Sequence, residues 1–157
     1  MKPLDLLLFS ISIGLTSFTA YTFCGAGPAD ADVPTTAPER NPAFRSIVIH
    51  HSATHAGSAA AFERNHRVRL GGLAYHFIIG NGSGAADGEV EQGYRWRDQI
   101  PGPHTKNQTV NLESIAICLV GDLEAAPPTR KQLAALMELL ERLRRECAIP
   151  PERVRSH

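Results

Sequence analysis

Short apolar runs separated by polar segments dominate the chain after residue 43. Residues 46–51, Ser-Ile-Val-Ile-His-His, form a β-branched run bounded by polar residues, which predicts a buried strand. The same pattern predicts strands over residues 73–79, 89–92 and 114–120, and the beginning of an extended segment over residues 154–157. We therefore expect a sheet built from these segments.

Two helices are predicted between these strands. Residues 58–69 predict a helix, with Ser58 as a possible cap; Ala61, Phe62, His66 and Arg69 stand at helical spacing, and Gly71 and Gly72 end the pattern. Residues 129–132, Thr-Arg-Lys-Gln, have the form of a capping box, and an apolar stripe follows to about Cys147. Strands interleaved with helices predict an α/β layered domain.

The N-terminal residues differ from the rest of the chain. Residues 6–23 are apolar with interspersed Ser and Thr, and residues 25–42 contain four prolines. The first stretch is typical of an exported protein and the second of a tether. We predict an export signal or membrane anchor over residues 1–24, a Pro/Ala-rich linker over residues 25–43 and a folded domain over residues 44–157. Cleavage of the signal and retention as an anchor remain alternatives.

Charge and cysteine content narrow the function classes. Sixteen basic and sixteen acidic residues cancel, so no global positive field draws nucleic acid to the domain, and no nucleic-acid partner is expected. Three cysteines without zinc-finger spacing do not predict a disulfide framework. Cys118 lies in an apolar run and is expected in the core, although a bridge to Cys147 remains an alternative in an oxidising compartment.

Polar side chains occur at or near the ends of the predicted strands. His50 ends the first strand, where a rigid backbone suits a metal ligand, and the neighbouring His51 could be mistaken for it. His76 is expected to be a structural core residue, because it points to the sheet face opposite Tyr75. Residues 94–97, Tyr-Arg-Trp-Arg, are interpreted as a solvated rim rather than a nucleic-acid platform, with the lining of a glycan groove as an alternative.

Several segments, in order, resemble the type 2 N-acetylmuramoyl-L-alanine amidases, the zinc family that includes the peptidoglycan recognition proteins. They are Ile-His-His-Ser-Ala-Thr at 49–54, Tyr-His-Phe-Ile-Ile at 75–79, Gly-Pro-His at 102–104, Asn111, Ser-Ile-Ala-Ile at 114–117 and Val-Arg-Ser-His at 154–157. The resemblance implies an α/β single domain with a mixed central β-sheet flanked by helices. It also implies zinc-dependent hydrolysis of the amide bond between N-acetylmuramic acid and L-alanine in peptidoglycan.

The resemblance assigns roles to four residues. His50 and His157 correspond to the first two zinc ligands, Tyr75 to the tyrosine that donates a hydrogen bond to the reacting carbonyl oxygen, and His104 to a histidine that binds substrate. The third ligand of the family lies beyond the second, so we expect a domain truncated at its C-terminus, without the last zinc loop and terminal helix. Cys118 stands where some members carry a catalytic glutamate, and no general base is assigned.

Alternatives accompany these roles. Tyr75 could be an ordinary strand aromatic and His104 a loop histidine facing solvent. With two zinc ligands, the chain could also be a non-catalytic binding module for muropeptides. The expected location is periplasmic or extracellular, with a possible membrane tether and a bacterial source, and the sequence does not indicate an oligomeric state.

Overall fold

The computed structural model describes residue 41 and residues 43–157. The predicted export segment and all but two residues of the predicted linker lie outside the described residues. Within the described part, no helix combines the length and apolar character needed to cross a membrane.

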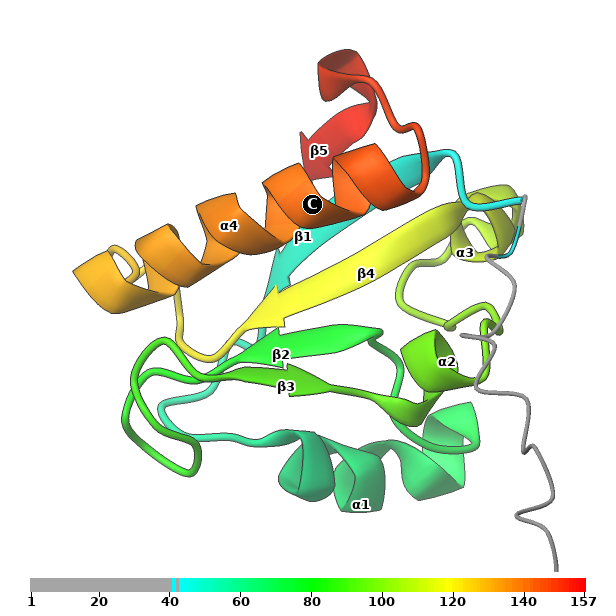
Figure 1. The fold of residues 1–157 in the computed structure, drawn as a ribbon. Helices are drawn as coiled ribbons and strands as arrows, with labels where there is room; N and C mark the ends of the chain where they lie inside the picture. The colour runs from blue at the N-terminus through cyan, green and yellow to red at the C-terminus, as the bar shows by residue number, and fades with distance from the viewer. Residues whose placement is uncertain (1–40, 42) are drawn as a thin grey trace, which may run out of the picture. The chain divides into compact units, whose positions relative to one another are not determined.

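A five-stranded mixed sheet forms the centre of the domain, in the order β3-β2-β4-β1-β5 (Figure 1). Strands β1, β2, β4 and β5 run parallel to one another, and β3 alone runs antiparallel, against β2. The bounds are Ser46–His51 for β1, Phe77–Ile79 for β2, Val90–Gln92 for β3, Ser114–Leu119 for β4 and Val154–Ser156 for β5. The predicted mixed sheet flanked by helices is confirmed.

Helices cover both faces of this sheet (Figure 1). Helix α4, Arg130–Glu146, packs leucines against the face that carries Ile47 and Ile117. Helix α1, Ala59–Leu70, packs Phe62 into a second cluster with Cys118 on the opposite face. Since alternate residues of a strand point to opposite faces, β1 gives its isoleucines to the α4 side and His50 to the α1 side.

The predicted caps fix where both helices begin. The Ser58 hydroxyl accepts a hydrogen bond from the Ala61 amide at 3.2 Å, and Thr129 forms a reciprocal capping box with Gln132. The buried Gln132 amide nitrogen also donates to the carbonyl oxygens of Ile79 and Val120, at 3.0 and 2.9 Å. Gln132 thus holds α4 against the carboxyl ends of β2 and β4.

The strand predicted over residues 73–79 is shorter than expected, because β2 begins only at Phe77. His76 explains the difference: its Nδ1 accepts a hydrogen bond from the Ala116 amide at 2.9 Å. A side chain therefore takes an amide that regular pairing with β4 would give to a backbone carbonyl. Three short helical segments were not predicted: α2, Tyr94–Arg97; α3, Gln108–Glu113; and a 3-10 turn, Pro151–Arg153.

The interpretation of residues 94–97 as a solvated rim is wrong for two of its residues. Trp96 is 3% exposed and packs on Phe44 and Phe77, whereas Arg95 is 9% exposed. The Arg95 guanidinium donates to the carbonyl oxygens of Leu73 and, at 2.6 Å, Pro101. These two positions therefore serve the core and the adjoining loops.

The cysteine predictions can also be compared with the structure. Cys118 is fully buried in β4, as expected for a core residue. The alternative of a Cys118–Cys147 disulfide is not realised, because Cys118 is a free cysteine.

His76 predicts a pH dependence of stability. Burial lowers its pKa to about 4, whereas an unfolded histidine has a pKa of about 6.5. Between these values the unfolded chain binds a proton that the folded chain does not, so stability is lost as pH falls from about 6.5 to about 4. We expect His76 to contribute about 3 kcal/mol to this loss.

NMR of the histidine rings, combined with urea unfolding at several pH values, checks this expectation. Because Nδ1 accepts from an amide, Nε2 must carry the proton that it donates to the Ile100 carbonyl at 3.1 Å. A His76 ring that titrates near pH 6.5, or that carries its proton on Nδ1, would contradict the assignment.

Candidate functional site

His50 lies near the end of β1, on the sheet face that α1 covers. It is 6% exposed, and the neighbouring His51 points to the other face, where its Nδ1 accepts a hydrogen bond from the Leu123 amide at 3.1 Å. Strand alternation therefore separates two histidines that are adjacent in sequence. Of the two, only His50 faces the other candidate residues.

The parallel pairing of β5 with β1 brings His157 to His50. Beyond the last paired residue of β5, the His157 amide donates to the Ile49 carbonyl at 3.0 Å. The two imidazole centroids are consequently 5.0 Å apart. The structure thus brings together His50 and His157, which are more than one hundred positions apart in sequence.

His104 approaches the same place from a loop. Its Nδ1 lies 2.9 Å from His50 Nε2 in a hydrogen bond, with ring centroids 5.0 Å apart. A side chain could not replace Gly102 in this loop, because a Cβ there would lie 2.2 Å from the Ala74 carbonyl oxygen. His104 Nε2 is buried and has no hydrogen-bond partner among the described residues.

Asn111, in α3, holds the His104 loop in place. Its side-chain oxygen accepts hydrogen bonds from the Thr105 amide and hydroxyl at 2.8 and 2.9 Å, and its side-chain nitrogen donates to the Thr105 carbonyl at 2.9 Å. The sequence identified Asn111 as part of a motif but did not indicate this role. Three bonds to one neighbouring residue fix the backbone immediately after His104.

Burial keeps His50 and His104 uncharged. It is the main cause that lowers the pKa of His50 to about 3, with further lowering by His104, His157 and His51. Burial likewise lowers the pKa of His104 to about 4, and the charges of His76 and His157 add to the effect. Both rings are therefore neutral at pH 7, the form in which imidazole binds metals.

Tyr75 completes the cluster from the segment before β2. Its ring centroid is 5.5 Å from that of His50 and 5.7 Å from that of His66, which belongs to α1. Burial, together with the neighbouring Cys118 thiol, raises the pKa of the Tyr75 hydroxyl. Burial also raises the pKa of Cys118 to about 12, so this pair is protonated at neutral pH.

The donor set suits zinc in part. Neutral imidazoles are common zinc ligands, and His50 and His157 are close together. Within residue 41 and residues 43–157, however, no group of three or more His, Cys, Asp or Glu side chains is arranged to hold a metal ion. His50 Nε2 and His104 Nδ1 face each other rather than a common point. The described residues therefore supply two candidate ligands.

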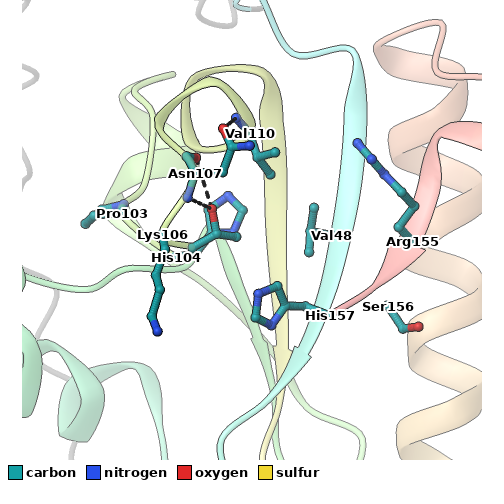
Figure 2. A pocket seen from close by; sticks show the side chains of 10 residues that line it. Val48, Pro103, His104, Lys106, Asn107, Val110, Arg155, Ser156 and His157 are labelled. Atoms are coloured by element: carbon teal, nitrogen blue, oxygen red, sulfur yellow. Dashed lines mark hydrogen bonds between the residues drawn. The ribbon is translucent and has the colours of Figure 1, made fainter.

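A groove of about 680 Å³ adjoins His104 and His157 (Figure 2). Val48 lies on its sheet side, and residues 103–107 with Val110 form the opposite side. The lining also contains Lys106 and Arg155, which sequence reasoning did not select. Arg155 lies beside Val48 only because β5 pairs with β1. Without knowledge of that pairing, the sequence gives no reason to place the two cations in one groove.

The fold and the histidine cluster define a class of protein: an α/β domain with a mixed sheet and a cluster of histidines on one face. Solved structures share this fold. Drosophila peptidoglycan recognition protein SA aligns with a TM-score of 0.59 and 22% identity over 74% of this chain and 69% of that one. Human PGRP-IBETAC, in complex with glycosamyl muramyl pentapeptide, aligns with a TM-score of 0.60 and 18% identity over 78% and 76%. A mutant of Drosophila PGRP-LB in complex with tracheal cytotoxin aligns with a TM-score of 0.57 and 23% identity over 73% and 69%.

Sequence comparison gives the family directly. The profile of the N-acetylmuramoyl-L-alanine amidases matches residues 39–157, and the chain belongs to this family. No curated protein matches the sequence.

Replacement of Asn111 by Ala should loosen the His104 loop. The change removes three hydrogen bonds in a partly buried setting, and we expect a loss of about 2–4 kcal/mol in the free energy of unfolding. Urea unfolding measures the loss, and amide hydrogen exchange at Thr105 should accelerate. Gln108→Ala, on the exposed first turn of the same helix, is the matched control and should change neither quantity. Equal behaviour of the two variants would contradict the role of Asn111.

Proposed function

We propose that this protein is a zinc-dependent amidase that hydrolyses the bond between N-acetylmuramic acid and L-alanine in peptidoglycan. Membership of the N-acetylmuramoyl-L-alanine amidase family supports the substrate class. The observation that carries the proposal is the convergence of four side chains, from β1, two loops and the end of β5, on one face of the sheet: His50, Tyr75, His104 and His157.

His50 and His157 would hold the zinc ion as two of its ligands. Their rings are neighbours, and the lowered pKa of His50 keeps its nitrogens free of an extra proton at neutral pH. When bound, zinc lowers the pKa of a water molecule to about 7 and polarises a carbonyl group.

The side chains of the chain itself would orient the muramyl peptide. Tyr75 keeps its proton at neutral pH because its pKa is raised, so its hydroxyl can donate a hydrogen bond to the carbonyl oxygen as negative charge develops there. His104 Nε2, buried and without a partner among the described residues, is available to a polar atom of the substrate. Hydrolysis breaks the carbon–nitrogen bond, leaving the hydroxyl of water on the lactyl carbon and a proton on the amine of L-alanine.

Muropeptide binding without cleavage is the second candidate function. The observation that favours it is the absence, within the described residues, of a third metal ligand beside His50 and His157. Two neighbours in fold are solved in complex with muropeptide ligands, glycosamyl muramyl pentapeptide and tracheal cytotoxin. Both candidate functions require access to peptidoglycan, so the proposed location is outside the cytoplasmic membrane, with the apolar residues 6–23 as export signal or tether.

Digestion of purified peptidoglycan with the full chain distinguishes the two functions. Mass spectrometry should detect stem peptides with a free L-alanine amino terminus, lost with a chelator and restored by zinc. Intact peptidoglycan after zinc loading, with the protein retained on the sacculus, would favour binding alone. Neither release nor retention would contradict both candidate functions.

Replacement of His50 by Ala should reduce zinc affinity by at least about tenfold, because one of two neighbouring ligands is removed. Metal content after dialysis against buffered zinc measures the effect. His55→Ala is the matched control, since His55 is exposed and lies outside the cluster. Unchanged zinc content in the His50 variant would refute the ligand assignment.

Replacement of Tyr75 by Phe should leave zinc content unchanged but lower turnover. Removal of one preorganised donor costs about 3 kcal/mol in the transition state, or roughly a hundredfold in kcat. Steady-state assays on a soluble muropeptide would measure the loss. Turnover equal to that of the wild type would exclude Tyr75 from the reaction.

A further inference from the structure

The segment that leads to Tyr75 is buried but lies outside the sheet. Leu73 and Ala74 are each 2% exposed, whereas β2 begins only at Phe77. Their backbone amides therefore have no strand partner, although a buried N–H group needs a hydrogen-bond acceptor. The acceptors come from side chains of another element.

Helix α1 supplies both acceptors. The Glu63 carboxylate accepts a hydrogen bond from the Leu73 amide at 2.5 Å, and His66 Nδ1 accepts one from the Ala74 amide at 3.3 Å. Residues three positions apart on a helix are neighbours on its surface, so one face of α1 carries acceptors for two consecutive amides. The Glu63 bond is the shorter one, and hydrogen bonds to a carboxylate are stronger than those to a neutral acceptor.

Room for the Glu63 carboxylate depends on Gly72. The glycine has a φ of +71° at its predecessor and +128° at its own position, and a Cβ at Gly72 would lie 3.2 Å from both carboxylate oxygens of Glu63 and 2.8 Å from the Tyr94 hydroxyl. The Leu73 carbonyl accepts a hydrogen bond from the Arg95 guanidinium. Leu73 is thus held at its amide by α1 and at its carbonyl by α2.

An ion pair with Arg67 does not account for the placement of Glu63. Arg67 Nη2 lies 3.7 Å from Glu63 Oε1, and the Arg67 side chain is 70% exposed. Exposed pairs of this kind contribute little to stability. The Leu73 amide is therefore the principal partner of the carboxylate.

Aromatic rings of α1 contact Tyr75 directly. The His66 ring centroid is 5.7 Å from that of Tyr75, and the Phe62 ring, stacked on His66, meets the Tyr75 ring edge-on at 6.5 Å. The Tyr75 ring also lies 5.5 Å from that of His50. Ring contacts from α1, and its hydrogen bonds to the two preceding residues, thus act on the same tyrosine.

We propose that Glu63 is a positioning residue for Tyr75. Its bond to the Leu73 amide fixes the backbone two residues before the tyrosine, and so fixes where the Tyr75 hydroxyl lies relative to His50. His66 is the second residue of this support. The proposal rests on the proposed function, because it assumes that the Tyr75 hydroxyl acts on the substrate carbonyl. Glu63 acts through Tyr75 and not on the substrate.

Two substitutions remove the acceptor: Glu63→Ala, and Glu63→Met, which keeps the length of the side chain but offers only a weak sulfur acceptor. With the zinc-loaded full chain and a synthetic N-acetylmuramoyl tripeptide, both should lower kcat about tenfold at unchanged KM and zinc content, because a small displacement of a reacting group costs rate. Glu63→Gln keeps an acceptor oxygen and should retain most of the wild-type kcat. Equal kcat values for Glu63→Gln and Glu63→Met would overturn the role of the acceptor.

Arg67→Gln is the matched control. It removes the ion pair with Glu63 and leaves the bond to the Leu73 amide, so its kcat should equal that of the wild type. A tenfold loss in Arg67→Gln would transfer the effect from the amide bond to the ion pair and overturn the proposal.

A double-mutant cycle tests whether Glu63 acts through Tyr75. In the Tyr75→Phe background, Glu63→Met should lower kcat less than about twofold, because the hydroxyl that it positions is already absent. An equal tenfold loss in both backgrounds would show a general structural effect and overturn the positioning role.

Two measurements do not depend on hydrolysis. Amide hydrogen exchange at Leu73 should accelerate at least about tenfold in Glu63→Met and stay unchanged in Glu63→Gln. Fluorine NMR of the full chain labelled with 3-fluorotyrosine reports on Tyr75, whose signal is identified by its absence in Tyr75→Phe. That signal should be displaced in Glu63→Met and unchanged in Glu63→Gln.

The outcomes separate this proposal from the proposed function. A wild type that releases no stem peptide, but whose Tyr75 signal moves in Glu63→Met, would contradict the amidase and support the positioning of Tyr75. A Tyr75 signal that is the same in Glu63→Met and the wild type would overturn the positioning, whether or not the chain hydrolyses peptidoglycan.

Discussion

The parallel pairing of β1 with both β4 and β5 is the constraint on which the rest of the site depends. In the pairing of β1 with β4, His50 lies opposite Cys118. In the pairing of β1 with β5, Ile49 lies opposite Ser156, and the amide of the next residue, His157, donates a hydrogen bond to the Ile49 carbonyl. A slip of one residue in any of these strands would exchange the two faces, moving side chains such as His50 to the face that α4 covers. Ile47 and Ile49 of β1 pack against α4. Because alternate residues of a strand point to opposite faces, His50 then lies on the other face of the sheet.

This arrangement has an electrostatic consequence. Burial and the nearness of other imidazoles disfavour the charged forms of His50 and His104, whose pKa values fall to about 3 and about 4. Opposite shifts act on Tyr75 and Cys118, which keep their protons because burial disfavours their anions. At neutral pH these four side chains are thus uncharged donors and acceptors beside a groove that Lys106 and Arg155 line.

Sequence reasoning predicted the elements whose signal is local. The β-branched run at residues 46–51 and the capping box at Thr129 each identified an element correctly, and the resemblance to the amidases selected residues that the fold does bring together. Local signals failed where tertiary contacts decide. Arg95 is buried because its guanidinium donates hydrogen bonds to the carbonyl oxygens of Leu73 and Pro101. Those contacts form only in the folded chain, so the sequence alone suggests a surface arginine. Lys106 and Arg155 are remote in sequence and share a groove only after β5 has paired with β1.

X-ray absorption at the zinc K-edge tests the central claim most directly, because it reports which atoms surround a metal bound to the folded chain. With one equivalent of zinc, we expect scattering from at least two imidazole rings at about 2.0–2.1 Å. One ring should disappear from the spectrum in the His157→Ala variant. A spectrum without imidazole scattering, or one that His157→Ala leaves unchanged, would contradict the account of His50 and His157 as a zinc-binding pair.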